Sequence, residues 1–226
     1  MSKGQGMGID GDQCAQGGEG QTWLWNRPVG ECRATLILAH GAGAPMDSEF
    51  MQQMAERLAA RGVAVLRFEF DYMAARRLDG KKRPPNPQAK LLEQWRAVHD
   101  RVRQQVAGPL AIGGKSMGGR MASLLADELD VPALVCLGYP FHAIGKPDKP
   151  RVAHLAELRT PALIVQGERD PMGDRPKVAG YTLSQTIQVH WLTAADHDLK
   201  PLKSSGRTHA QHLEAAADAV AAFLTR

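Results

Sequence analysis

A serine lies between two glycines in the segment Gly114-Lys115-Ser116-Met117-Gly118, which has the pattern G-x-S-x-G. This pattern is typical of a nucleophilic serine on a sharp turn between a strand and a helix. The residues two positions before and after the serine must be small, because such a turn brings backbone segments close together. An apolar run over 110–112 precedes the motif, and a helical pattern over 117–128 follows it. The context predicts that Ser116 is a nucleophile at a helix start, where backbone amides favour developing negative charge.

The residues Gly114-Lys115-Ser116 also match the last three positions of a phosphate-binding loop, whose pattern is G-x-x-x-x-G-K-[ST]. That pattern requires a glycine at position 109, which is Pro109, and Gly108 is one position too early. Residues 110–112 have the pattern of a strand rather than of a loop around phosphates. We therefore favour a catalytic serine over nucleotide binding, with a glycine-rich turn without chemistry as the plainer alternative.

A nucleophilic serine needs a base, and in proteins with this motif the acid and then the histidine follow the serine along the chain. Asp170 follows an apolar run over 162–166, and His197 follows the next run over 187–192. The chain has eight histidines, and His197 satisfies both the chain order and the position after a strand. We expect His197 to be the general base and Asp170 the acid that orients it. Glu168 and Asp174 are the alternatives for the acid.

An oxyanion hole needs two backbone N–H donors. One is expected from Met117, the residue after the nucleophile. The other is expected from the glycine-rich loop 40–44, which follows the first core strand. Ala42 is the first choice there and Gly41 the second, and an ordinary tight turn is the alternative interpretation.

Apolar runs and amphipathic patterns alternate along the chain and define the elements that position these residues. Expected strands are 35–39, 63–68, 109–112, 133–137, 162–166 and 187–192, with 22–25 as a further edge strand. Expected helices are 50–58, 91–106, 117–128 and 205–224. Continuous apolar strands between helices predict an α/β fold with a mostly parallel central sheet covered on both faces. The glycine-rich residues 1–20 are expected to be a flexible leader, and 21–226 a single domain.

Five segments together resemble the small α/β hydrolases that include testis-expressed protein thirty and its bacterial relatives. These segments are 38–43 (LAHGAG), 67–70 (RFEF), 114–120 (GKSMGGR), 138–142 (GYPFH) and 166–170 (QGERD). The chain is similar, more loosely, to dienelactone hydrolases, which use cysteine where this chain has Ser116. The resemblance implies an α/β-hydrolase fold without a cap domain and with a Ser-Asp-His triad. The interval between 137 and 162 is also too short for a helical lid.

The bulk composition excludes several other classes of protein. Net charge is +4 over 226 residues, no nucleic-acid-binding motif is present, and no apolar stretch is long enough to cross a membrane. Three widely spaced cysteines favour neither a disulfide framework nor a zinc site, and no metal or organic cofactor is implied. We expect a cytoplasmic protein, and no pattern specifies its oligomeric state.

These observations predict a serine hydrolase that cleaves carboxylic ester or thioester bonds of a small substrate through an acyl-enzyme. The alternative is a non-catalytic protein-binding module that keeps the fold. Two basic segments, 71–90 and 142–151, carry local charges of +4 and +2 and favour an anionic substrate. A solvated basic surface is the other interpretation of these charges. No further substrate-binding residue is predicted.

Overall fold

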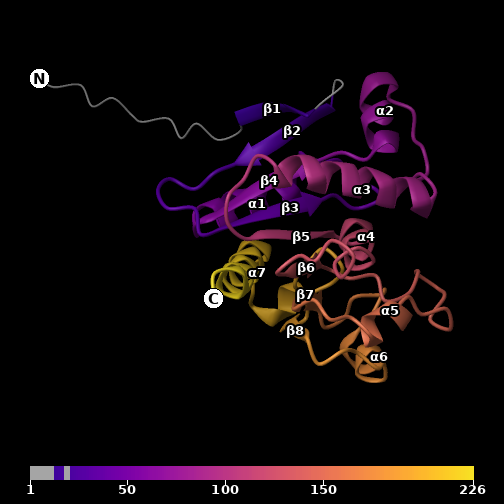
Figure 1. Ribbon diagram of the computed structural model, residues 1–226. Helices are drawn as coiled ribbons and strands as arrows, with labels where there is room; N and C mark the ends of the chain where they lie inside the picture. Colours follow the sequence, from indigo (N-terminus) through magenta and orange to yellow (C-terminus); the bar gives the residue numbers. More distant parts are fainter. Residues whose placement is uncertain (1–12, 18–20) are drawn as a thin grey trace, which may run out of the picture.

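The computed structural model describes residues 13–17 and 21–226, which form an eight-stranded sheet (Figure 1). The strand order is β1-β2-β4-β3-β5-β6-β7-β8. The strands are β1 (Gln13–Gly17), β2 (Gln21–Asn26), β3 (Ala34–Ala39), β4 (Val63–Phe68), β5 (Leu110–Lys115), β6 (Leu134–Leu137), β7 (Ala162–Gly167) and β8 (Ile187–Leu192). Strands β3 to β8 are mutually parallel, whereas β2 pairs antiparallel with β4 and β1 antiparallel with β2. The predicted mostly parallel sheet is confirmed.

The helices connect the parallel strands and cover both faces of the sheet. They are α1 (Glu49–Ala59), α2 (Asp71–Asp79), α3 (Gln88–Arg103), α4 (Met117–Ser123), α5 (Ala153–Ala156), α6 (Arg175–Ala179), the 3-10 turn η1 (Lys203–Ser205) and α7 (His209–Leu224). Helices α1 and α7 pack on one face and α3 and α4 on the other. Between β6 and β7 the four-residue α5 is the one helix that the structure describes, so this interval contains no cap domain.

Alternation along each strand divides the core into two layers. In β3, Leu36 and Leu38 pack in the layer with α1 and α7, whereas Ile37 and Ala39 pack in the layer with α3 and α4. Successive side chains of a strand point to opposite faces, so a strand buried on both faces is apolar at every position. This is why the strands appear in the sequence as continuous apolar runs.

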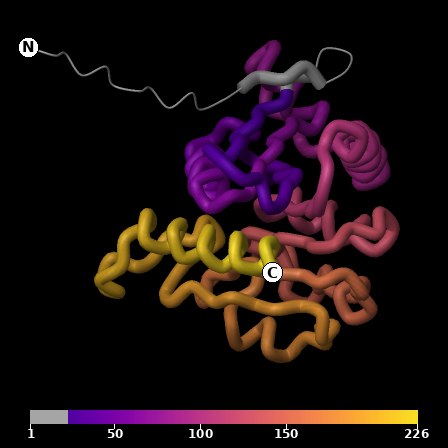
Figure 2. The backbone as a smooth tube through the Cα atoms, turned by 60° about the vertical axis from the view of Figure 1, so that its left-hand side comes forward, coloured from indigo at the N-terminus to yellow at the C-terminus, as the bar shows by residue number. Residues whose placement is uncertain are grey.

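Helix α7, yellow in Figure 2, packs beside α1 on its face of the sheet. Its start is specified locally, because Thr208 and Gln211 form a capping box in which each side chain accepts a hydrogen bond from the other residue's backbone N–H. At the end of α1, Arg61 pairs with Glu214 and Asp218 of α7. These exposed ion pairs contribute little stability, since solvent screens them. Apolar packing therefore holds the two helices together.

Helix α2 lies in the polar, proline-rich stretch where no element was predicted. It begins after Phe70, and Gly80 ends it in the left-handed conformation with φ of 70°. The buried residues Tyr72 and Met73 supply its apolar contact with the core, and Arg77 ties it to Glu69, the residue after β4. Too few apolar residues mark the helix for a periodic pattern, which is why tertiary contacts decide its conformation.

The predicted leader includes a strand, because residues 13–17 pair with β2 across the whole of β1. This corrects the expectation of a flexible segment at those five positions. The rest of that predicted leader, 1–12 and 18–20, lies outside the described residues. Helix α4 is also shorter than expected, ending at Ser123 rather than at residue 128. In the part of the chain that the structure covers, no helix combines the length and apolar character that a membrane crossing requires.

A buried histidine contact predicts a specific acid sensitivity of the fold. His154 Nε2 lies 2.8 Å from Ser123 Oγ, and burial, together with the charge of Arg120, lowers the pKa of His154 to about 4. The unfolded chain therefore binds the proton more readily, and stability falls as the pH drops from about 6.5 towards 4. Allowing for partial exposure, we expect a loss of about 1–2 kcal/mol in the free energy of unfolding.

Urea denaturation at about pH 7 and about pH 4.5 measures this loss. His154→Gln keeps a side-chain N–H donor for Ser123 but cannot titrate. The variant should lose less stability than the wild type over this interval. An equal loss in both proteins would contradict the assignment to His154.

Candidate active site

Ser116 occupies a strained turn between β5 and α4. Its backbone has φ of 50° and ψ of −115°, a conformation that residues other than glycine rarely adopt. Strain of this kind costs on the order of 1–3 kcal/mol and persists where the surrounding structure enforces it. Here Ser116 N–H donates to the Leu137 carbonyl at 3.0 Å, which anchors the turn to the end of β6. The turn directs the hydroxyl away from the sheet.

Close packing explains why glycines flank the serine. A Cβ added at Gly114 would lie 2.5 Å from the Gly118 carbonyl carbon and 2.7 Å from the Ala39 oxygen. A Cβ at Gly118 would lie 2.5 Å from that same oxygen. Because all these contacts are with backbone atoms, no side-chain rotation relieves them. The G-x-S-x-G pattern is thus required by the approach of α4 to β3.

The structure brings Ser116, His197 and Asp170 together in one hydrogen-bonded chain. His197 Nε2 lies 2.8 Å from Ser116 Oγ, and His197 Nδ1 lies 2.7 Å from Asp170 Oδ2. The three residues follow the carboxyl ends of β5, β7 and β8, where loops of parallel sheets carry functional groups. With Nδ1 donating to the carboxylate, Nε2 is free to accept the serine proton. This arrangement can activate a hydroxyl as a nucleophile.

Asp170 is fully buried, and backbone and side-chain donors saturate its carboxylate. Oδ1 accepts the Met172 N–H at 2.8 Å, and Oδ2 accepts Gln166 Nε2 at 2.9 Å in addition to the histidine. Gln166 is itself held, because its Oε1 accepts the Tyr139 N–H at 2.7 Å. A carboxylate with these donors keeps one orientation and presents a fixed acceptor to the imidazole. Sequence reasoning missed Gln166, although a glutamine that ends an apolar strand four residues before the acid was a usable signal.

The other candidate acids have separate structural roles. Glu168 pairs with Arg175 at 2.9 Å and accepts the Ala194 N–H at 3.1 Å. Asp174 caps α6 by accepting the Lys177 N–H at 2.9 Å. Of the three acids that the sequence left open, Asp170 is the one that contacts His197.

Lys115 contacts the loop that carries His197, and the sequence did not reveal this role. Its Nζ donates to the His197 carbonyl at 3.0 Å, lies 3.3 Å from Asp198 Oδ1 and faces the Phe50 ring at 5.5 Å. Burial lowers the pKa of Lys115, and the charge of Asp198 opposes that shift. The ammonium connects β5, which ends at Lys115, to the loop that carries His197. The Lys115 side chain therefore helps to position His197.

The loop after β3 reaches the serine from the other side. A Cβ added at Gly41 would lie 3.7 Å from Ser116 Cβ. The Gly41 carbonyl is directed towards His40 and Tyr72, since it accepts hydrogen bonds from His40 Nδ1 at 2.6 Å and from Tyr72 Oη at 3.4 Å. A trans peptide directs its N–H opposite to its carbonyl, so the Ala42 N–H is turned away from Tyr72. The predicted oxyanion donors thus lie on two segments next to Ser116: Ala42 is in the loop after β3, and Met117 is the first residue of α4.

His40 fixes this loop as a neutral imidazole. Its Nε2 accepts the Phe70 N–H at 3.1 Å, which leaves the proton on Nδ1 for the Gly41 carbonyl. Burial lowers the pKa of His40 and so favours the neutral form. Tyr72 adds a second constraint, since its hydroxyl donates to the Ala42 carbonyl at 3.0 Å. Helix α2, which the sequence did not reveal, therefore helps to shape the loop.

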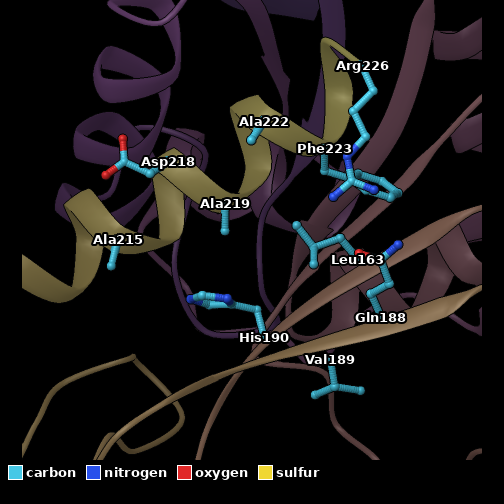
Figure 3. A pocket seen from close by; sticks show the side chains of 10 residues that line it. All are labelled: Leu163, Gln188, Val189, His190, Ala215, Asp218, Ala219, Ala222, Phe223 and Arg226. Carbon is cyan, nitrogen blue, oxygen red and sulfur yellow. The ribbon is translucent and has the colours of Figure 1, made fainter.

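A cavity of about 580 Å³ lies away from this site, between α7 and the strands β7 and β8 (Figure 3). Ser116, His197 and Asp170 do not line it. Leu163 and Gln188 are the second residues of their strands, whereas Ser116, Asp170 and His197 follow the strand ends. The cavity wall is formed by Leu163, Gln188, Val189, His190, Ala215, Asp218, Ala219, Ala222, Phe223 and Arg226.

Comparison with solved structures shows the same fold in several hydrolases. An alpha-beta serine hydrolase homologue from Coxiella burnetii is 20% identical, with a TM-score of 0.68 over 98% of this chain and 99% of that chain. A serine hydrolase without lid from Xanthomonas campestris is 19% identical, with a TM-score of 0.70 and the same coverage. Dienelactone hydrolase from Anabaena variabilis is 19% identical, with a TM-score of 0.69 over 94% of each chain.

The family model of the alpha/beta hydrolase domain matches residues 32–225, which is most of the chain. The matched range contains Ser116, Asp170, His197 and the loop after β3. The strand order and the position of each of these residues after a strand agree with that match. The chain therefore belongs to the alpha/beta hydrolase domain family.

Proposed function

We propose that this protein is a serine hydrolase that cleaves carboxylic ester or thioester bonds of a small substrate. The observation that carries the proposal is the continuous chain of hydrogen bonds from Ser116 through His197 to buried Asp170. Activation of a serine hydroxyl requires this order of groups within hydrogen-bond reach. The interval after β6 holds no cap, which supports access of substrate from solvent.

The reaction begins when Ser116 Oγ attacks the substrate carbonyl carbon. A bond forms between Oγ and this carbon while the hydroxyl proton moves to His197 Nε2. The carbonyl oxygen takes the negative charge, and the backbone N–H groups of Met117 and Ala42 donate to it, with Gly41 as the alternative donor. Asp170 stabilises the imidazolium that forms and keeps its orientation.

The tetrahedral intermediate then collapses to an acyl-enzyme. The bond to the leaving alcohol or thiol breaks, and His197 returns its proton to that group. Water next attacks the acyl carbon while the same imidazole takes a proton from it. The acid leaves, and Ser116 regains its proton. No step uses a metal or an organic cofactor.

The resemblance of the five sequence segments to one group of small α/β hydrolases belongs to the same proposal. We infer that the chain is related to the group that includes testis-expressed protein thirty, because the resemblance extends to the GKSMGGR segment that contains Ser116 and to the HGAG segment of the loop after β3. Cytoplasmic location is likewise our expectation from the sequence. A protein-binding module without catalysis is the alternative, and the assembled hydrogen-bond chain argues against it.

Turnover of para-nitrophenyl acetate and of a matched acetyl thioester tests the proposal. The wild type should release para-nitrophenol with a burst whose amplitude equals the enzyme concentration if deacylation is slow, and Ser116→Ala should remove the burst. We expect kcat to fall by about 10⁴-fold or more in this variant. Equal rates for wild type and variant would contradict the proposal, and so would the absence of turnover in a folded wild type.

A further inference from the structure

Two arginines beside the candidate active site have no carboxylate partner in the described part of the chain, whereas three others near the site do. Arg77 pairs with Glu69, Arg83 with Asp79, and Arg175 with Glu168. Neither Arg120 nor Arg151 forms an ion pair with any residue in the described part of the chain. Arg151 belongs to the basic segment 142–151, whereas most arginines of the segment 71–90 are already engaged.

Arg120 is half-buried and incompletely satisfied. Its Nη2 donates to Gln88 Oε1 at 3.1 Å, but its buried Nε has no partner among the described residues. A buried donor without an acceptor costs free energy, and a charged group costs more than a neutral one. Burial lowers the pKa of Arg120, and the nearby charge of Arg151 adds to that effect. The two guanidinium groups therefore create a local positive charge that no carboxylate of the described chain neutralises.

The position of the pair relates it to the nucleophile. The Arg120 N–H donates to the Ser116 carbonyl at 3.0 Å, so Arg120 lies one helical turn after the serine. Arg151 is held next to the end of β6, because its N–H donates to the Phe141 carbonyl at 2.7 Å and its carbonyl accepts Tyr139 Oη at 3.0 Å. Strand β6 is the neighbour of β5, which carries Ser116. Both arginines thus lie at the catalytic edge of the sheet.

We propose that Arg120 and Arg151 form a subsite that binds an anionic group of the substrate, a carboxylate or a phosphate, beside Ser116. This inference rests on the proposed function and narrows its substrate class to esters or thioesters that carry a negative charge. Ser116 is the N-cap of α4 and Arg120 lies four residues further along, so we expect the long Arg120 side chain to reach a charge a few bonds from the scissile carbonyl. The planar guanidinium offers several N–H donors to such an anion.

Matched pairs of esters that differ in one charge test the subsite. On the acyl side the pair is para-nitrophenyl hydrogen glutarate and para-nitrophenyl pentanoate. On the leaving-group side it is para-acetoxybenzoate and phenyl acetate. The quantity measured is the ratio of kcat/KM for the anionic ester to that for the neutral ester, which cancels any general loss of folding or positioning.

We expect the wild type to prefer the anionic member of at least one pair, and added salt to weaken that preference. Arg120→Gln and Arg151→Gln should each lower the ratio, with Arg120→Gln giving about a 10- to 100-fold decrease, as for the loss of a hydrogen bond to a charged group. The matched control is Arg159→Gln. Arg159 is exposed and lies before β7, at the opposite edge of the sheet.

The outcomes separate this inference from the proposed function. If the wild type hydrolyses both members of each pair with equal kcat/KM, the subsite is wrong while the hydrolase proposal stands. A ratio that Arg120→Gln and Arg159→Gln change equally also overturns the subsite. If the folded wild type hydrolyses none of the esters, the proposed function fails and the subsite with it.

Discussion

Replacing Asp170 by Asn is expected to lower kcat for ester hydrolysis about 10⁴-fold, with little change in KM. The buried Asp170 carboxylate accepts the His197 Nδ1 proton at 2.7 Å. An asparagine amide can donate to Nδ1 instead, which would place the imidazole proton on Nε2 and remove the base from Ser116. Steady-state kinetics with para-nitrophenyl acetate measure the effect. Circular dichroism establishes that the variant is folded.

Glu168→Gln is the matched control for this prediction. Glu168 is a neighbouring acid on the same loop, but it binds Arg175 and the Ala194 N–H rather than the histidine. We expect this variant to lose less than about 10-fold in kcat, since surface ion pairs of this kind contribute little. A loss in Glu168→Gln as large as that in Asp170→Asn would show that the acid is assigned incorrectly.

Gly114→Ala is expected to destabilise the fold by at least about 2–3 kcal/mol and to abolish ester turnover. The added methyl group would lie 2.5 Å from the Gly118 carbonyl carbon and 2.6 Å from the Gly119 nitrogen. Relief of these contacts requires α4 to move away from β5, which also moves Ser116 relative to His197. Urea denaturation measures the loss of stability, and turnover of para-nitrophenyl acetate measures the loss of function.

Gly43→Ala is the corresponding control in the loop after β3. A Cβ at Gly43 meets no atom within 4 Å, and its φ is outside the left-handed range. We expect stability within about 0.5 kcal/mol of wild type, as for ordinary surface substitutions. If Gly114→Ala were as stable and as active as Gly43→Ala, the close packing of the elbow would not be a requirement of the fold.

The succession of strands and helices along the chain, the mostly parallel sheet and the sheet edge at which Ser116 lies could be predicted from the sequence because their signals are local. The elbow is one contiguous motif, and its strand and helix neighbours are apolar runs of the expected period. Asp170 and His197 follow recognisable strands, so their meeting with Ser116 follows from a parallel sheet whose carboxyl ends share one edge. Between Asp170, Glu168 and Asp174, however, only three-dimensional contacts decide.

The supporting roles of Lys115 and Tyr72 could not be predicted, because they depend on contacts between distant segments. Lys115 reaches the His197 carbonyl across 82 positions in sequence, and Tyr72 reaches Ala42 across 30. Helix α2 was missed because its few buried residues form no periodic pattern. The absence of an ion pair between Arg120 and any acid of residues 13–17 and 21–226 is likewise not visible in a sequence that has carboxylates throughout.

The most direct measurement of the central claim is covalent labelling of the wild type with a fluorophosphonate, followed by identification of the modified residue by mass spectrometry. We predict stoichiometric labelling of Ser116, which Ser116→Ala abolishes and Asp170→Asn slows strongly, because only an activated hydroxyl reacts at a useful rate. A folded wild type that is not labelled, or that is labelled at another residue, would contradict the account of Ser116, His197 and Asp170 as a catalytic triad.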